Sequence, residues 1–381
     1  MKRKLNVGID SRFLSKIAQG TGTYTSQLIG AFDDMRRAGC LDAFQFHLLS
    51  HRWRTTEVTV DPAAAFARKK LLTDYTPLNV LAGYAWASKR YDLDLIHTNY
   101  LCSVWPSRTK KVMTIHDILF RTHPEYFPRS LRFGVHLLSF ASIRSAHGLI
   151  TVSEYSRSQI ERYFPASEGK IRVIPEAPAD AFHLIHSEAA NRQFLSSRFG
   201  LASPYILYVG RFAPIKNLDA LLDFIRSYGK RGPIRVVLVG DSDTAFPSPL
   251  LEKKIRSSPD ATVLKSLSLT ELNHLYNGAL FVYFVSFGEG FGLPILEAMA
   301  AGTPVLTSNT TACSETAGDA AIKVNPFEME DISGAMRQLI HDASLRLTLK
   351  KKGLMRAKGF SWKKCAEQTL SFYRKICHES P

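Results

Sequence analysis

The stretch VSFGEGFGLPILEAMAAG, from Val285 to Gly302, joins a predicted strand to a predicted helix. The apolar run over residues 279–287 is typical of a buried strand, and the loop after it interleaves glycines with Glu289 and a phenylalanine. A proline in the first turn and a glycine just past the end suit a helix over residues 294–301. Strand, glycine loop and helix N-terminus together predict an anion site, in which backbone N–H groups and the helix dipole face the ligand.

Two carboxylates, Glu289 and Glu297, stand eight residues apart across this turn. Beside an anion site they would repel a phosphate group unless they faced another part of the ligand, such as sugar hydroxyls. The stretch therefore favours a ligand that carries both negative charge and hydroxyl groups.

The rest of the chain alternates predicted strands and helices in both halves, which favours an α/β fold with two parallel-sheet domains that face each other. At 381 residues the chain is longer than one hydrophobic core usually supports. We predict an N-terminal domain over residues 1–180, a polar, serine-rich linker over 181–203, a C-terminal domain over 204–360, and a helix and tail over 361–381.

The first half opens with a strand over residues 4–10, a polar loop that ends in Gly20-Thr21-Gly22, and a helix. Gly22 either brings the backbone close to a phosphate group or serves a turn that needs glycine. Helices are expected between later strands, over residues 63–72 and 77–89.

Residues 110–120, KKVMTIHDILF, contain a strand that runs into His116 and Asp117. A histidine at the end of a buried strand either bonds a bound sugar or is a capping residue satisfied by its own backbone. The helix expected over residues 129–147 has one basic and one apolar stripe. It either lies on a membrane surface or packs its apolar face on a sheet.

In the second half, Arg211 directly follows a strand and Lys216 comes five residues later. Two cations at the end of a strand suit a diphosphate. The alternative is a pair of solvated basic residues on a loop. The glycine loop of the same domain favours the diphosphate.

Composition and charge exclude several classes of protein. No run approaches the ~18 apolar residues that would span a bilayer, and Asp10 and Arg12 interrupt the N-terminal apolar stretch, so no signal peptide is expected. Five scattered cysteines without a C-x-x-C motif favour a reduced, cytosolic chain without structural zinc. The net charge of +15 lies at the two ends, with +10 over residues 1–178, −1 over 179–350 and +6 over 351–381. Such basic regions attract phosphorylated partners or anionic lipids.

Two stretches, VGRFAPIKN and FGEGFGLPILEAMAAGTPV, together resemble the signature of retaining GT-B glycosyltransferases of the Glu-x7-Glu group, which includes glycogen synthases and bacterial mannosyltransferases. The resemblance covers nearly the whole chain, and its further pieces come in the expected order: GIDSRFL, GTGTYT, TIHD, TVSEYS, VIPEAP, SETAGDAA and FSWKKCAEQTL. The first half is most similar to bacterial O-antigen and capsule transferases that use mannose or rhamnose donors. The resemblance implies the GT-B fold, with a C-terminal helix that crosses back to the first domain.

The resemblance also implies a role for each matching residue. The catalytic residues would be Arg211 and Lys216, which hold the donor diphosphate, Glu289, which contacts hydroxyls of the donor sugar, and His116 with Asp117 nearby, from the first domain. The remaining donor-binding residues would be Gly22, which lines the diphosphate, Gly290, Phe291, Gly292 and Leu293 in the glycine loop, and Glu297, which accepts from ribose hydroxyls.

The implied reaction retains the anomeric configuration, with the leaving phosphate accepting the proton of the acceptor. No metal or other cofactor is expected, because Asp92-x-Asp94 and Asp241-x-Asp243 are interpreted as ordinary turns. The implied substrates are a nucleotide sugar, with GDP-linked favoured over UDP- or dTDP-linked, and a polyprenyl-diphosphate-linked oligosaccharide acceptor. We expect lipopolysaccharide O-antigen assembly on the anionic inner face of the cytoplasmic membrane.

One position departs from the pattern. Asparagine-glycine often follows VIP in this group, whereas this chain has Glu176-Ala177. Rival hypotheses are a UDP-sugar-dependent transferase for capsule or exopolysaccharide, an epimerase or phosphorylase, and a non-catalytic basic protein that binds nucleotides or nucleic acid. No nucleic-acid partner is expected, since no aromatic–basic cluster or nucleic-acid module is found.

Overall fold

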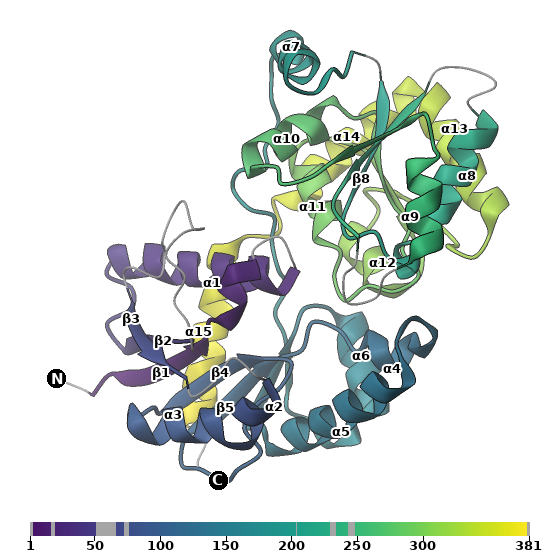
Figure 1. The fold of residues 1–381 in the computed structure, drawn as a ribbon. Coiled ribbons are helices and arrows are strands. Elements are labelled where there is room, and N and C mark those ends of the chain that lie inside the picture. The colour runs from purple at the N-terminus through teal and green to yellow at the C-terminus, as the bar shows by residue number, and fades with distance from the viewer. Residues whose placement is uncertain are drawn as a thin grey trace. The chain divides into compact units, whose positions relative to one another are not determined.

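The computed structural model describes residues 3–16, 20–50, 66–71, 76–202, 204–228, 234–242 and 248–378. The chain forms two compact units. The first holds residues 1–124, 128–176 and 361–381, and the second holds residues 125–127 and 177–360. Each unit is built on one parallel sheet covered by helices (Figure 1).

The first unit has a sheet of seven strands in the order β3-β2-β1-β4-β5-β6-β7, with every pairing parallel. The strands are β1 (Leu5–Asp10), β2 (Phe44–Ser50), β3 (Ala67–Lys70), β4 (Leu95–Asn99), β5 (Lys110–Thr114), β6 (Gly148–Thr151) and β7 (Ile171–Val173). The strands β4 and β6 are buried along their whole length, as expected for a parallel sheet covered on both faces.

Helices of the first unit alternate with its strands. They are α1 (Gly20–Arg37), α2 (Thr76–Leu78), α3 (Tyr84–Arg90), α4 (Leu119–Thr122), α5 (Arg129–Ser145), α6 (Glu154–Tyr163) and α15 (Trp362–His378). The last helix, yellow in Figure 1, packs against α1 and β5. The prediction of a C-terminal helix that returns to the first domain is therefore confirmed.

The second unit has six parallel strands in the order β10-β9-β8-β11-β12-β13. The strands are β8 (Tyr205–Val209), β9 (Arg235–Val239), β10 (Ala261–Leu264), β11 (Phe281–Phe284), β12 (Val305–Ser308) and β13 (Ile322–Val324). The helices are α7 (Glu188–Phe199), α8 (Leu218–Tyr228), α9 (Pro249–Arg256), α10 (Leu269–Gly278), α11 (Leu293–Ala300), α12 (Thr311–Ala317), α13 (Met329–His341) and α14 (Ala343–Ala357).

Both sheets have a point at which the strand order reverses. It lies between β1 and β4 in the first unit and between β8 and β11 in the second. Ligands of open parallel sheets bind outside the carboxyl ends of the strands at such a point. The stretches after β8 and β11 hold Arg211, Lys216 and Glu289, so the topology puts the predicted donor residues at the expected edge.

Three local predictions differ from the structure. Gly20 to Gly22 do not end a loop but form the first turn of α1. The helix predicted over residues 63–72 is wrong for its described part, because residues 67–70 form the edge strand β3, paired with β2. The segment predicted as a linker, 181–203, contains α7, which packs on α10 within the second unit.

Candidate active site

Three hydroxyl groups bond to the end of β11 and to the glycine loop that follows it. Thr307 Oγ1 donates to the carbonyl of Phe284 at 2.8 Å, and Ser308 Oγ donates to that of Ser286 at 2.5 Å. Thr316 Oγ1 donates to the carbonyl of Phe291 at 2.7 Å. Because all three donors are buried, the loop has a fixed shape rather than an adaptable one.

Gly292 turns the loop into helix α11. Its φ of +94° lies in the left-handed region, and a Cβ there would come within 3.0 Å of Ile295 Cδ1. Only glycine meets both conditions without strain. Helix α11 then begins at Leu293 with Pro294 in its first turn, so its first N–H groups have no intrahelical partner and lie at the end of the loop.

Lys216 and Glu289 form an ion pair between Lys216 Nζ and Glu289 Oε1. The same carboxylate oxygen accepts from Ser286 Oγ at 3.1 Å. Within the part of the chain that the structure describes, Oε2 of Glu289 receives no hydrogen bond. The lysine ammonium has three donors, so it can hold Glu289 and still donate to a phosphate.

Two hydrogen bonds hold the Lys216 loop, one to the loop after β11 and one to the segment after β13. The backbone N–H of Phe287 donates to the carbonyl of Ile215 at 2.9 Å. Asn217, which has a φ of +54°, donates from Nδ2 to the carbonyl of Pro326 at 2.9 Å. These bonds fix Lys216 beside Glu289 rather than leaving it on a solvated loop.

Arg211 follows β8, as predicted, and its side chain is exposed. Its carbonyl accepts from Tyr208 Oη at 2.7 Å, and that tyrosine is fully buried. The backbone at Arg211 is thus anchored to the core of the second unit, while the guanidinium reaches the surface.

Glu297 lies on α11 and accepts a 2.7 Å hydrogen bond from Tyr276 Oη at its Oε2 atom. Burial, followed by the charge of Glu297, raises the pKa of Tyr276 well above its usual value. Tyr276 therefore stays a donor at any working pH and holds the carboxylate in place. Its contribution was not predicted from the sequence.

The predicted residues of the first unit lie at the carboxyl edge of its sheet. Gly22 is buried in the first turn of α1, where backbone N–H groups lack intrahelical partners. His116 and Asp117 follow β5. Asp117 Oδ1 accepts from the N–H of Leu119 at 3.2 Å, so this carboxylate caps the start of α4.

His116 has two side-chain partners that the sequence did not identify. Its Nδ1 lies 2.9 Å from Glu176 Oε1, and its Nε2 lies 3.4 Å from Asn99 Oδ1. Glu176 is buried, with 4% of its surface exposed. The departure from the family pattern at Glu176 was the signal that could have pointed to this contact.

A second buried histidine, His97, is connected to His116 through Thr114 and Tyr24. Its Nε2 contacts Thr114 Oγ1 at 2.7 Å and its Nδ1 contacts Tyr373 Oη at 2.5 Å. Burial, followed by the nearby His116, lowers the pKa of His97 to about 3. His97 is therefore neutral, and its contact with Tyr373 connects helix α15 to the central strand β4.

The two Asp-x-Asp motifs are engaged elsewhere. Asp92 and Asp94 both contact Arg3 Nη2 at 3.2 Å, and Asp94 accepts from the N–H of Asn6 at 2.8 Å. Asp241 pairs with Lys265 at 2.6 Å, and Asp243 lies outside the described residues. Among the residues with a described placement, no group of three or more His, Cys, Asp or Glu side chains could hold a metal ion.

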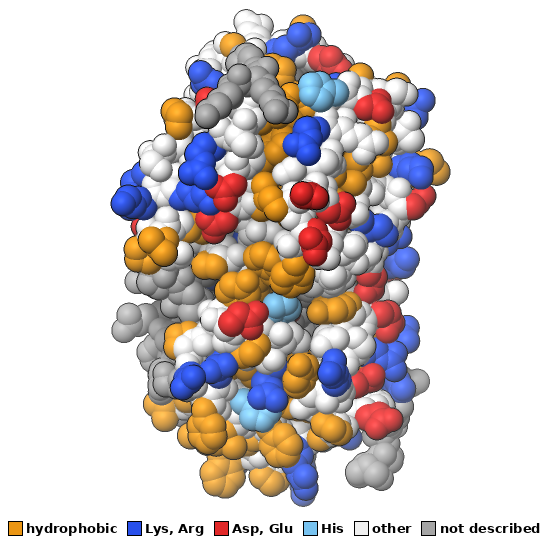
Figure 2. All heavy atoms as spheres, turned by 90° about the vertical axis from the view of Figure 1, so that its right-hand side faces the viewer, with side chains coloured by type: hydrophobic (Ala, Val, Ile, Leu, Met, Phe, Trp, Pro, Cys, Tyr) orange, Lys and Arg blue, Asp and Glu red, His pale blue; other side chains and the backbone are white. Residues whose placement is uncertain are grey.

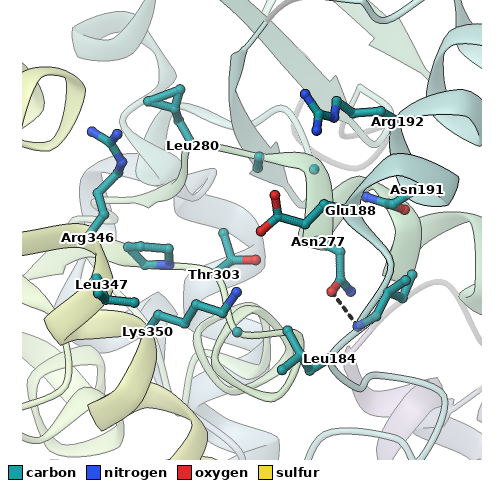
Figure 3. Close-up of a pocket in the computed structure, with 15 residues that line it drawn as sticks. Leu184, Glu188, Asn191, Arg192, Asn277, Leu280, Thr303, Arg346, Leu347 and Lys350 are labelled. Carbon is teal, nitrogen blue, oxygen red and sulfur yellow. Dashed lines mark hydrogen bonds between the residues drawn. The ribbon is translucent and has the colours of Figure 1, made fainter. Parts of the chain in front are cut away.

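The second unit also contains a cavity of about 400 Å³ that includes none of the predicted donor residues. Glu188 and Arg192 of α7 line one part of it, and Arg346 and Lys350 of α14 line another (Figure 3). Arg346 donates to the carbonyls of residues 339 and 340, so its guanidinium caps the end of α13. The cavity is separate from the candidate active site.

The structure thus brings Lys216 and Glu289 into contact, with the glycine loop and Glu297 on the helix that follows. His116 and Asp117 lie at the edge of the other sheet, with Gly22 in the first turn of α1.

Comparisons with known proteins identify the family of the chain. Residues 191–355 match the family described as Glycosyl transferases group 1, and residues 20–177 match Glycosyltransferase Family 4. The chain is 31% identical over 307 residues to the O-antigen chain mannosyltransferase B of Escherichia coli, covering 77% of each chain.

Solved structures show the same fold. Sucrose-phosphate synthase from Thermosynechococcus elongatus superposes with a TM-score of 0.79 at 20% identity, over 98% of this chain and 99% of that one. Anabaena HepE in complex with UDP-glucose gives 0.71 at 17% identity, over 98% and 100%. The predicted GT-B fold is confirmed, and the chain belongs to the group 1 glycosyltransferases, with a Family 4 N-terminal half.

Proposed function

We propose that this glycosyltransferase moves a hexose, mannose or rhamnose, from a GDP-linked donor to a polyprenyl-diphosphate-linked oligosaccharide during lipopolysaccharide O-antigen assembly. The name of the 31% identical relative supports the sugar and the pathway. The observation that carries the proposal is the pair of Lys216 and Glu289, because it sets a cation for phosphate directly beside a carboxylate for sugar hydroxyls.

In this proposal the site residues of the second unit bind different parts of the donor. Lys216 and Arg211 bind the diphosphate and stabilise the charge that develops as it leaves. Glu289 accepts hydrogen bonds from sugar hydroxyls at Oε2, and Glu297 accepts hydrogen bonds from the ribose hydroxyls. The N–H groups at the start of α11 add donors that need no reorganisation.

The proposed reaction proceeds on one face of the sugar. The acceptor hydroxyl oxygen bonds to the anomeric carbon, the bond from that carbon to the phosphate oxygen breaks, and the proton passes to the leaving phosphate. The nucleoside diphosphate then carries the negative charge that Lys216 and Arg211 stabilise. We propose no metal, since these two cations supply the charge that a metal would supply.

A UDP-linked donor is the second candidate. HepE, which has the same fold, is described in complex with UDP-glucose. A capsule or exopolysaccharide transferase with a UDP-sugar would use the same diphosphate and sugar contacts. The nucleotide base of the donor therefore distinguishes the two candidates.

The test is a transfer assay with purified protein, polyprenyl-diphosphate-linked oligosaccharide, and GDP-mannose, UDP-glucose or dTDP-rhamnose. We expect a mannosylated lipid from GDP-mannose, with an α-anomeric proton and carbon in the NMR spectrum, which matches the configuration of the donor. A β-linked product would overturn retention, and transfer from UDP-glucose alone would favour the second candidate.

We also propose that the first unit binds an anionic membrane surface. Helix α5 exposes Phe133, Leu137 and Phe140, with 75%, 58% and 43% of their surfaces accessible. They are spaced four and three residues apart and therefore share one face of the helix. Arg129 and Arg144 are exposed near its two ends, while Leu138 packs against the core.

The space-filling view supports this proposal. The right-hand side of Figure 1, which includes α4, α5 and α6, faces the viewer in Figure 2. Hydrophobic side chains gather at the lower end of that face with Lys and Arg side chains around them (Figure 2). None of the helices that the structure describes is both long enough and apolar enough to cross a bilayer.

Vesicle flotation tests the membrane proposal. We expect binding to phosphatidylglycerol-containing vesicles at low salt and release at high salt, because the attraction is partly electrostatic. Phe133→Ser with Leu137→Ser should weaken binding, whereas Met355→Ser in the second unit, which is also exposed, should not. Equal binding to neutral vesicles at all salt concentrations would contradict it.

A further inference from the structure

The contact between His116 and Glu176 is buried at the edge of the first sheet. Only 10% of the histidine side chain and 5% of the glutamate side chain are exposed. The chain leaves the first unit immediately after Glu176. A carboxylate is costly to bury unless it is paired, so a charged partner is expected beside it.

Hydrogen bonds around Asn99 fix which of its side-chain atoms faces His116. Thr25 Oγ1 donates to the carbonyl of Thr21 at 2.8 Å, so it is an acceptor for Asn99 Nδ2 at 3.3 Å. The oxygen of the Asn99 amide then faces His116 Nε2 at 3.4 Å. An amide oxygen can only accept.

Both ring nitrogens of His116 therefore face acceptors. Glu176 Oε1 lies at Nδ1, and Asn99 Oδ1 lies at Nε2. A neutral imidazole has one N–H donor, and only the protonated ring has two. The 3.4 Å contact is long for a hydrogen bond, so Nε2–H is the more weakly held of the two donors.

The other neighbours of the His116 ring are aromatic rings, backbone groups and a neutral histidine. Tyr24 approaches edge-on with ring centroids 4.7 Å apart, and Tyr100 lies at 5.4 Å. Ser156 Oγ donates to the carbonyl of His116 at 3.0 Å. His97, the nearest other histidine of the network, is neutral, and Asp117 Oδ1 accepts from the N–H of Leu119.

We infer that Glu176 is a positioning residue that holds His116 as a doubly protonated ring, so that Nε2 presents an N–H donor to an oxygen of the bound donor sugar. The second half of this statement rests on the proposed function. The first half concerns the protein alone and is tested without substrate.

The protonation state is measured by nitrogen-15 NMR of the histidine rings in the full chain at neutral pH. A doubly protonated ring gives two nitrogen signals close together, and a neutral ring gives two that are far apart. His116→Asn identifies the signals by their loss. We expect close signals in the wild type and widely separated ones in Glu176→Gln, with Glu168→Gln, an exposed site in the same unit, as the unchanged control. Widely separated signals in the wild type would overturn the inference, and that spectrum needs no variant to fold.

Kinetics test the positioning role. Glu176→Gln and His116→Gln should each lower kcat/KM for the donor by about 10- to 100-fold, as expected for a charged hydrogen bond. The double variant should lose no more than either single one, because the two side chains act as a unit. Glu176→Asp, which keeps the charge, should recover part of the activity.

The outcomes separate the two proposals. Fully additive losses, or Glu176→Asp no better than Glu176→Gln at equal melting temperature, would contradict the positioning role. A wild-type protein that transfers no sugar from any donor would overturn the proposed function, while the NMR spectra would still decide the state of His116.

Discussion

The carboxyl edges of the two sheets are built in opposite ways. In the second unit, charged side chains follow two strands: Lys216 pairs with Glu289, and Arg211 is exposed after β8. In the first unit, His116 and Glu176 are buried within a network of neutral partners. The first arrangement suits a ligand that brings its own charge, and the second suits a single oriented donor.

The largest expected effect on transfer comes from Lys216, at the carboxyl edge of the second sheet, here called the charged edge. Lys216→Ala should lower kcat for transfer by about 10²- to 10³-fold, because one preorganised donor to the developing negative charge is lost. Lys265→Ala, which removes the exposed pair with Asp241 in the same unit, should change kcat little. Steady-state rates with saturating donor measure both.

Melting temperature serves as the control for Lys216→Ala, since the variant leaves Glu289 with one partner fewer. Transfer by this variant at near wild-type rates would remove Lys216 from the site, and the two edges would then no longer differ in the way described.

A smaller effect, on the pH dependence of stability, is expected from His97 in the first unit. His97 belongs to the buried network around His116, here called the buried edge. The pKa of His97 is about 3 in the folded chain and near 6.5 when unfolded, so only the unfolded state binds its proton between these values. This contribution to stability is complete above pH 6.5 and is lost as the pH falls toward 3.

The measurement compares the free energy of unfolding in urea at pH 7.5 and pH 5.5. The wild type should lose about 1.4 kcal/mol more over this interval than His97→Gln, which lacks the titration. The same loss in both proteins would show that His97 does not titrate as described.

The smallest effect is expected at Tyr276→Phe, which removes the hydrogen bond to Glu297. The cost should be about 1 kcal/mol, which appears as a fewfold rise in KM for the donor. Tyr228→Phe, which removes a hydrogen bond to His341 in the same unit, is the matched control. A larger rise for the control would argue against a role for Tyr276 in holding Glu297.

The difference between the two edges also explains which site residues the sequence could predict. The charged edge is encoded locally: Arg211, Lys216, Glu289 and Glu297 each follow a strand within one unit, and the glycine loop marks the turn into α11. The motif therefore predicted these residues together, and the structure brings Lys216 and Glu289 into contact.

The buried edge is assembled from distant parts of the chain. Tyr24, Asn99 and Glu176 come from three separate segments and meet His116 only in the fold. No spacing rule connects them, so the sequence predicted a role for His116 and marked Glu176 only as a departure from the family pattern. The edge strand β3 was missed for a related reason, since the four residues ARKK form a strand by pairing with β2.

The most direct test of the account is calorimetric titration of GDP and GDP-mannose into the wild type, Lys216→Ala and Glu289→Gln. We expect Lys216→Ala to weaken the binding of both ligands by a similar factor, because Lys216 is proposed to bind the diphosphate. Glu289→Gln should weaken GDP-mannose and leave GDP unchanged or tighter, because Glu289 binds the sugar. If neither variant changes the affinity for either ligand, or if Glu289→Gln weakens both ligands equally, the proposed division of donor binding between the two residues is wrong.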